Sequence, residues 1–263
     1  MTTSAQIHES TDLCLALGRS LIYETLALAF RPPAGRTRCL EASSREAAAL
    51  PEAAAWLDRR LTTGLEKRAR RLAGHPQLRD LEARARVCDA LFGHTGRGPI
   101  PPYETEYGDD TLFQKPQEMS DVAAFVRAFG LVLDPGGRER IDHLSCELEF
   151  LAFLTRKEAH AQQTGDGAML EETVAAQRAF VRDHLGRFGP AFARRVLAAD
   201  PEGAYGAAAA LLLEFLDAER RRLGVLLGPG TLRLREPIDD GAPIACGDAG
   251  ACAPGSCDPR AAE

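Results

Sequence analysis

Residues 142–161 read DHLSCELEFLAFLTRKEAHA, and their apolar side chains recur with the period of an α-helix. One face of this helix would carry four leucines: Leu144, Leu148, Leu151 and Leu154. A second face would carry Cys146, Phe150 and Phe153. A helix that is apolar over so wide an arc needs neighbours on several sides. The segment therefore predicts the central helix of an α-helical bundle.

The helical period continues through most of the chain on both sides of this segment. A first helix is predicted over residues 13–30, where an apolar stripe ends at Pro32-Pro33. Further helices are predicted over residues 37–50, 51–73, 76–92, 120–130, 168–188, 190–199 and 201–227. β-Branched residues are scarce, and no internal repeat is visible. The pattern predicts an all-α fold, a single helical bundle of about nine to eleven helices over residues 13–227.

The two ends of the chain lack the pattern of packed helices. Residues 1–12 contain no basic segment followed by an apolar one, so they predict a flexible N-terminus and no signal peptide. Residues 228–263 are rich in Gly and Pro and poor in large apolar side chains. Such a composition predicts a flexible, disordered C-terminal tail.

Charge and hydropathy exclude several classes of partner. The formal net charge is −6, and the Lys and Arg residues form no basic stripe, so nucleic acid is not an expected partner. The apolar segment 13–30 carries Arg19 and Glu24, which are costly in lipid, so stable membrane insertion is not expected. The expected location is the cytoplasm, where single cysteines inside helices remain reduced.

The common catalytic motifs are absent from the sequence. It contains no Gly-x-Ser-x-Gly, no Gly-x4-Gly-Lys-Ser/Thr and no His-Glu-x-x-His. Two polar constellations stand out instead. The first is the loop YETEYGDD at residues 103–110, and the second is the turn ERIDH at residues 139–143, followed one helical turn later by Glu147. The simplest interpretations are a solvated loop, an Asp142 helix cap and an exposed His143.

Taken together, these motifs are similar to a known family. YETEYG at residues 103–108, MSDVAAFVRAFGL at 119–131 and ExxDHLxxELEFL at 139–151 resemble, in order and spacing, the TorD/DmsD family. That family consists of cytoplasmic chaperones dedicated to molybdopterin enzymes of the dimethyl sulfoxide reductase type. The resemblance covers residues 13–227 and leaves the C-terminal tail outside. One departure is Ile141, where many relatives have a proline that would preset the turn.

The resemblance implies a chaperone and not an enzyme. Its partner would be the apo form of a molybdopterin oxidoreductase catalytic subunit with its N-terminal signal segment, held in a groove beside the loop and the turn. Carboxylates suit the paired arginines of such a signal, and tyrosine rings offer cation–π contacts. Because Asp142 and His143 begin a helix, their side chains can point out of the bundle toward a neighbouring loop. The candidate partner-binding residues are Tyr103, Glu104, Glu106, Tyr107, Asp142, His143 and Glu147. No cofactor of the chain itself is implied.

Alternative functions remain compatible with the residues. The tail cysteines Cys246, Cys252 and Cys257 could bind Zn²⁺ or a soft metal, which would suit a metal-delivery or redox-responsive protein. Their spacing is not Cys-x-x-Cys, so incidental thiols on a mobile segment are the simpler interpretation. A hydrolase using Asp142 and His143 as a base pair lacks an evident nucleophile. The hinge at residues 134–137 would permit domain swapping and hence a homodimer.

Overall fold

The computed structural model describes residues 4–33, 38–61, 63–93, 98–109, 114–133 and 139–236. Within these ranges the helices are α1 (Ser4–Phe30), α2 (Arg45–Leu61), α3 (Leu65–Ala73), α4 (Leu81–Phe92), α5 (Gln114–Ala128), α6 (Leu144–Thr164), α7 (Gly167–Phe180), α8 (Gly186–Ala199) and α9 (Ala204–Leu223). α7 and α8 join without a break through a π-helical turn, Val181–Leu185. The only extended pairing in these ranges consists of two isolated β-bridges. The predicted all-α class is confirmed, with slightly fewer continuous helices than expected.

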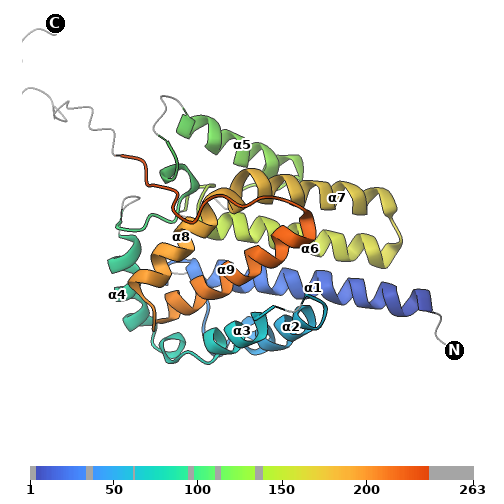
Figure 1. The fold of residues 1–263 in the computed structure, drawn as a ribbon, viewed down its shortest axis with the longest axis horizontal. Coiled ribbons are helices and arrows are strands. Elements are labelled where there is room, and N and C mark those ends of the chain that lie inside the picture. The colour runs from blue at the N-terminus through green and yellow to red at the C-terminus, as the bar shows by residue number, and fades with distance from the viewer. Residues whose placement is uncertain are drawn as a thin grey trace, which may run out of the picture.

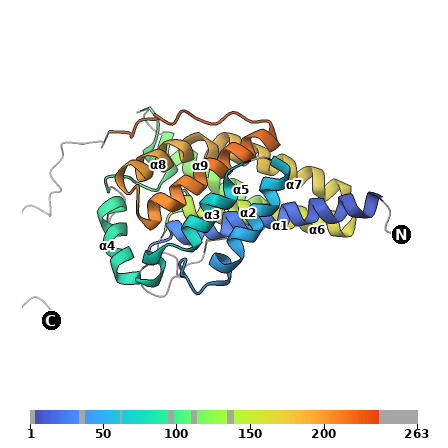
Figure 2. The same cartoon turned by 60° about the horizontal axis from the view of Figure 1, so that its bottom comes forward.

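The predicted central helix is α6, which lies alongside α1 through the middle of the molecule (Figure 1). α2 and α3 cover one side of this pair, and α7 packs against α6 on the other side (Figures 1 and 2). α9 runs between α8, α3 and α1. The four leucines of the α6 pattern, Leu144, Leu148, Leu151 and Leu154, are all buried, as the wide apolar arc predicts.

α1 contains a stretch, Thr11–Phe30, that has the length and hydropathy of a membrane span. Two thirds of this window, 67%, is buried against the other helices. Its apolar character is therefore accounted for by the core, which the helix shares with α6. Among the described residues it is the single helix that meets both criteria.

Several helix boundaries differ from those predicted. α1 begins at Ser4, upstream of the predicted start, because residues 4–12 contain no Gly or Pro to prevent the helix from extending. α2 runs through Pro51 instead of ending before it, and the break in the predicted 51–73 helix falls just before α3, at Gly64. Tertiary contacts with α1 and α9 hold both helices in place and override the proline signal.

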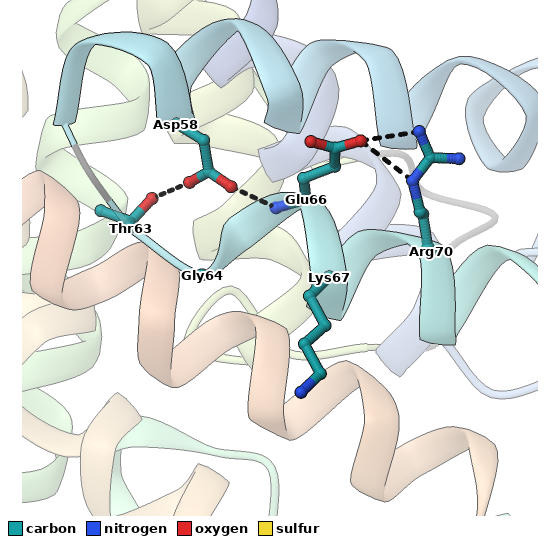
Figure 3. A pocket seen from close by; sticks show the side chains of 6 residues that line it. All are labelled: Asp58, Thr63, Gly64, Glu66, Lys67 and Arg70. Atoms are coloured by element: carbon teal, nitrogen blue, oxygen red, sulfur yellow. Dashed lines mark hydrogen bonds and ion pairs between the residues drawn. The ribbon is translucent and has the colours of Figure 1, made fainter.

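A side chain on α2 supplies the missing cap of α3 (Figure 3). Gly64 precedes α3 and has no side chain to cap it. The carboxylate of Asp58 accepts the backbone N–H groups of Leu65 at 3.1 Å and Glu66 at 2.8 Å, and the Thr63 hydroxyl also donates to it. Asp58 also lines an open depression of about 390 Å³ between the two helices. The oxygens of Asp58 are already occupied by the cap. We therefore assign no binding role to this depression, which lies where α2 and α3 meet.

Charged side chains are buried where α1, α6 and α9 meet, and they pair with one another. Arg19 of α1 pairs with Glu158 of α6, and the Tyr23 hydroxyl donates to Glu219 of α9 at 3.0 Å. Burial alone would oppose ionisation of Glu219, but Arg222, which donates to it at 2.8 and 2.9 Å, lowers its pKa below the usual value. The buried charges are thus compensated, and their geometry fixes the register of three helices.

The chain continues beyond α9 as a packed strap, residues 228–236, which runs back across the helices (Figure 2). The backbone N–H of Gly228 donates to the carbonyl of Gly186 at 2.9 Å, and Arg195 donates to the carbonyl of Leu232 at 3.1 Å. The predicted boundary at residue 227 is therefore too early. Composition suggested a tail, but the alternating residues LRLR at 232–235 find partners on the bundle. Residues 237–263, including Cys246, Cys252 and Cys257, lie outside the described residues.

We expect Asp58→Ala to lower the free energy of unfolding by about 1–2 kcal/mol, because the first turn of α3 loses two hydrogen bonds to the Asp58 carboxylate. Urea unfolding followed by circular dichroism would measure the change. The matched control is Glu66→Ala, which removes an exposed i,i+4 ion pair with Arg70 and should cost less than about 0.5 kcal/mol. Equal effects of the two substitutions would show that Asp58 acts only as a surface charge.

Candidate functional site

The two polar motifs meet in space, although 36 residues separate Tyr103 from Glu139. Tyr103 and His143 form an isolated antiparallel bridge, and their rings meet edge to face with centroids 5.1 Å apart. The backbone N–H of Glu104 donates to the carbonyl of Asp142 at 2.9 Å. The loop therefore lies directly on the turn that begins α6.

Asp142 is 0% exposed, and its carboxylate is satisfied by partners within the chain. Arg140 donates to its two oxygens at 3.0 and 2.7 Å, and the Thr105 hydroxyl donates at 2.8 Å. Asp142 contacts the neighbouring loop, as expected, but the loop folds over the turn and covers the carboxylate, so it is not accessible to a partner. Asp142 thus ties the loop to the start of α6 through a forked, charge-assisted contact.

His143 caps α6, in the position that the simplest interpretation assigned to Asp142. Its Nδ1 accepts the backbone N–H of Ser145 at 3.0 Å, which leaves the ring proton on Nε2, 3.7 Å from Glu139. Burial, and then the positive charges of Arg31 and Arg140, lower the pKa of His143 to about 3. The ring is therefore neutral at pH 7. The expectation that His143 is exposed is wrong, since only 1% of it is accessible.

The two tyrosines of the loop have different surroundings. Tyr103 is partly exposed; its hydroxyl donates to Glu139 at 2.9 Å, and the guanidinium of Arg140 lies over its ring, 4.5 Å from the centroid. Tyr107 is fully buried and packs on Phe188, and its hydroxyl has no hydrogen-bond partner among the described residues. Tyr103 therefore borders the surface, whereas Tyr107 anchors the loop in the core.

Glu104 of the loop and Glu147 of α6 form a buried pair of carboxyl groups. Glu104 accepts Arg187 at 2.8 and 3.2 Å, and its other oxygen lies 3.1 Å from His184. Neither oxygen of Glu147 has a hydrogen-bond partner in the part of the chain that is described. Burial, and then the negative charges of Glu104 and Asp142, raise the pKa of Glu147 well above its ordinary value. Burial beside two other carboxyl groups thus favours the protonated form of Glu147.

The remaining predicted residue, Glu106, is also buried and paired with Lys115 at 2.9 Å. The structure thus gathers the seven predicted residues around one loop, but most of their charge is neutralised internally. They are Tyr103, Glu104, Glu106, Tyr107, Asp142, His143 and Glu147. Only Tyr103 is partly exposed, so the accessible part of the region is supplied by other residues.

An open depression of about 430 Å³ lies next to the loop, between α5 and the turn that joins α7 to α8. Its lining consists of Glu104, Glu118, Asp121, Ala124, Phe125, Asp183, His184 and Arg187. Four of these side chains are carboxylates and one is an arginine. Asp121 is exposed, and its carboxylate has no ion-pair or hydrogen-bond partner within the described part of the chain. The depression therefore combines an apolar wall at Phe125 with an excess of negative charge.

The sequence contained a signal for this depression that its interpretation missed. Glu118, Asp121 and Phe125 follow an i, i+3, i+7 spacing, which places them on one face of a helix. Two of them lie within the 119–131 motif, but that motif contributed no candidate residues. Asp183, on the π-helical turn, is contiguous with them only in space.

No group of metal-ligating side chains occurs in the described part of the chain. The predicted metal ligands, Cys246, Cys252 and Cys257, and the predicted hinge at residues 134–137 lie outside it. Cys14, Cys39, Cys88 and Cys146 are free thiols, buried or partly buried, as expected for small core residues.

We expect stability to fall as pH drops below about 6.5, because the unfolded chain then binds a proton that folded His143 accepts only near pH 3. His143→Asn keeps a capping oxygen and removes the titration. Its melting temperature should therefore decrease less between pH 7 and pH 4.5 than that of the wild type. His160→Asn, at an exposed position of α6, is the matched control. Identical pH profiles for His143→Asn and the wild type would contradict the capping role.

Comparisons with known proteins agree with the motifs. A family model described as "Nitrate reductase delta subunit" matches residues 46–194, more than half of the chain. The chaperone protein TorD of Vibrio cholerae serotype O1 (strain M66-2) is 36% identical over 149 residues, which are 56% of this chain and 64% of that protein. The selenate reductase assembly chaperone protein of Thauera selenatis is 35% identical over 133 residues, 49% of this chain and 64% of the relative.

The matches thus span just under two thirds of the length of these relatives. The family model extends from α2 to α8 and includes the loop, the turn and the lining of the depression. The three motifs lie inside this matched region, in the order that the resemblance requires. The chain therefore belongs to the TorD/DmsD family.

Proposed function

We propose that this chain is a cytoplasmic chaperone that binds the apo form of a molybdopterin oxidoreductase catalytic subunit, together with its N-terminal signal segment, and assists maturation of the enzyme. Relatives named as the TorD chaperone and as a selenate reductase assembly chaperone support this class of function. The observation that carries the proposal is the acidic depression beside the loop. The function is one of binding, and no catalytic step is assigned.

The depression suits a cationic segment with an apolar face. Among the described residues Asp121 has no partner and exposed Asp183 pairs with its neighbour Arg182, so both carboxylates can accept a guanidinium. Hydrogen bonds to charged groups contribute about 1.5–3 kcal/mol in proteins, and less where solvent screens them. Phe125 offers a ring face to a guanidinium or to an apolar side chain. A signal with paired arginines and an adjoining apolar stretch has this chemistry.

Of the residues predicted from the sequence, Glu104 lines this depression, and it is buried. Asp142 and His143 act as positioning residues, because one fastens the loop to the turn and the other caps α6. Tyr103, at the partly exposed edge, remains available for direct contact with the partner.

Asp121→Asn should weaken binding of a fluorescein-labelled peptide that carries paired arginines before an apolar stretch. We expect a rise in Kd of roughly threefold to tenfold, about 0.6–1.4 kcal/mol, because one exposed carboxylate contact is lost. Fluorescence anisotropy would measure Kd. Asp12→Asn, which removes an exposed carboxylate on the distant N-terminal part of α1, is the matched control and should leave Kd unchanged.

The same peptide with glutamines in place of its arginines should bind more weakly, and its affinity should depend less on salt. If both peptides bind the wild type equally, the depression does not recognise guanidinium groups. A pull-down from the native cell should recover an oxidoreductase subunit that lacks its molybdopterin. Recovery of only the cofactor-loaded enzyme would argue against a role before maturation.

A further inference from the structure

The strap at residues 228–236 ends on the same loop that borders the depression (Figure 1). Leu234 and Tyr107 form an isolated antiparallel bridge. Its two hydrogen bonds run from Gly108 N–H to the Arg233 carbonyl, at 3.0 Å, and from Arg235 N–H to the Glu106 carbonyl, at 2.9 Å. The strap therefore adds to the edge of the loop as a short extended segment.

Arg235 makes the principal side-chain contact of the strap. Its two terminal nitrogens donate to both carboxylate oxygens of Glu118, at 3.0 and 2.9 Å, and one of them also donates to the Thr105 carbonyl at 3.0 Å. The side chain is 2% exposed. Glu118 lines the depression and also lies 3.3 Å from Arg187. An arginine of the chain thus occupies a forked carboxylate site at the wall of the depression.

The local charge balance requires a second guanidinium at this position. Glu104 and Glu118 are largely buried, and without Arg235 they would share Arg187. Removing one partner of a largely buried carboxylate is unfavourable, so the site favours occupation by a cation. In the free protein the strap supplies that cation in cis.

Besides Arg235, the strap is held by partly buried Leu232 and Leu234, which pack on the core. Its backbone hydrogen bonds to other elements are few, and it contains no helix or ladder of its own. Arg233 points outward and pairs with Asp109, and both side chains are more than two thirds exposed. Leu226, just before the strap, is also exposed. An extended segment of this kind can exchange with another that offers the same contacts.

We propose that the Thr105–Gly108 edge and Glu118 form a binding surface for an extended, arginine-bearing segment of the partner, and that the strap is its internal occupant. The partner segment replaces residues 231–235, and its arginine takes the place of Arg235 on Glu118. This inference rests on the proposed function, because it specifies the surface on which the partner's cationic segment binds. An internal occupant lowers the apparent affinity by the fraction of molecules in which the site is open.

The test uses the full chain and the labelled paired-arginine peptide. Arg235→Gln removes the internal competitor, so the peptide should bind at least fivefold more tightly than to the wild type. Arg221→Gln, which removes an exposed arginine of α9 paired with Asp217, is the matched control and should change Kd less than twofold. Weaker binding to Arg235→Gln would overturn the proposal, because Arg235 would then be a permanent part of the wall.

Hydrogen exchange on the wild type provides a second readout that needs no substitution. Saturating peptide should accelerate exchange in the strap, where the Arg235 amide is held by the bridge to Glu106. If the strap amides stay equally protected with peptide bound, the peptide does not replace the strap. This outcome would overturn the inference while leaving the proposed function intact. If the peptide binds neither wild type nor Arg235→Gln, the proposed function itself fails. A synthetic peptide of strap residues 229–236 should compete with the labelled peptide for binding to the Arg235→Gln protein. The same synthetic peptide with glutamine in place of Arg235 should not compete.

Discussion

The buried carboxylate of Asp142 is the contact on which the functional region depends. It is accessible to neither solvent nor a partner, and it is held by Arg140 and by Thr105 of the loop. Two isolated bridges and the buried ring of Tyr107 also connect the loop to other segments. Through Asp142 the loop is fastened to the N-terminus of α6, the most deeply embedded helix, and so its outer edge is presented in one orientation.

Charge compensation then decides which parts of the region can interact. Glu104, Glu106 and Glu118 are neutralised by Arg187, Lys115 and Arg235, and burial beside other carboxyl groups raises the pKa of Glu147. The exposed carboxylates of the region are Asp121 of α5 and Asp183 of the π-helical turn, of which Asp183 pairs with Arg182. The acidic character of the loop sequence and the acidic character of the accessible surface therefore arise from different residues.

The sequence predicted the fold class correctly because helical periodicity is a local property. The leucine pattern of α6 identified the central helix, and the four leucines are buried. Boundaries were less reliable where tertiary contacts outweighed local signals. α2 runs through Pro51, and the first turn of α3 is capped by Asp58 from another helix instead of by a neighbour in sequence. Strap residues 232–235 looked like tail because their partners, Arg195 and Glu118, are remote in the chain.

By itself, the sequence determined the helical class, the family motifs and the set of seven residues that converge around the loop. It could do so because apolar periodicity and motif order are properties of the linear sequence. Only the tertiary structure decided which of those residues are accessible. Burial of Asp142, the capping role of His143 and the occupation of Glu118 by Arg235 depend on segments brought together from distant positions. The physical reason is that a carboxylate's role is set by the partners and solvent around it, and these are defined only when the chain has folded.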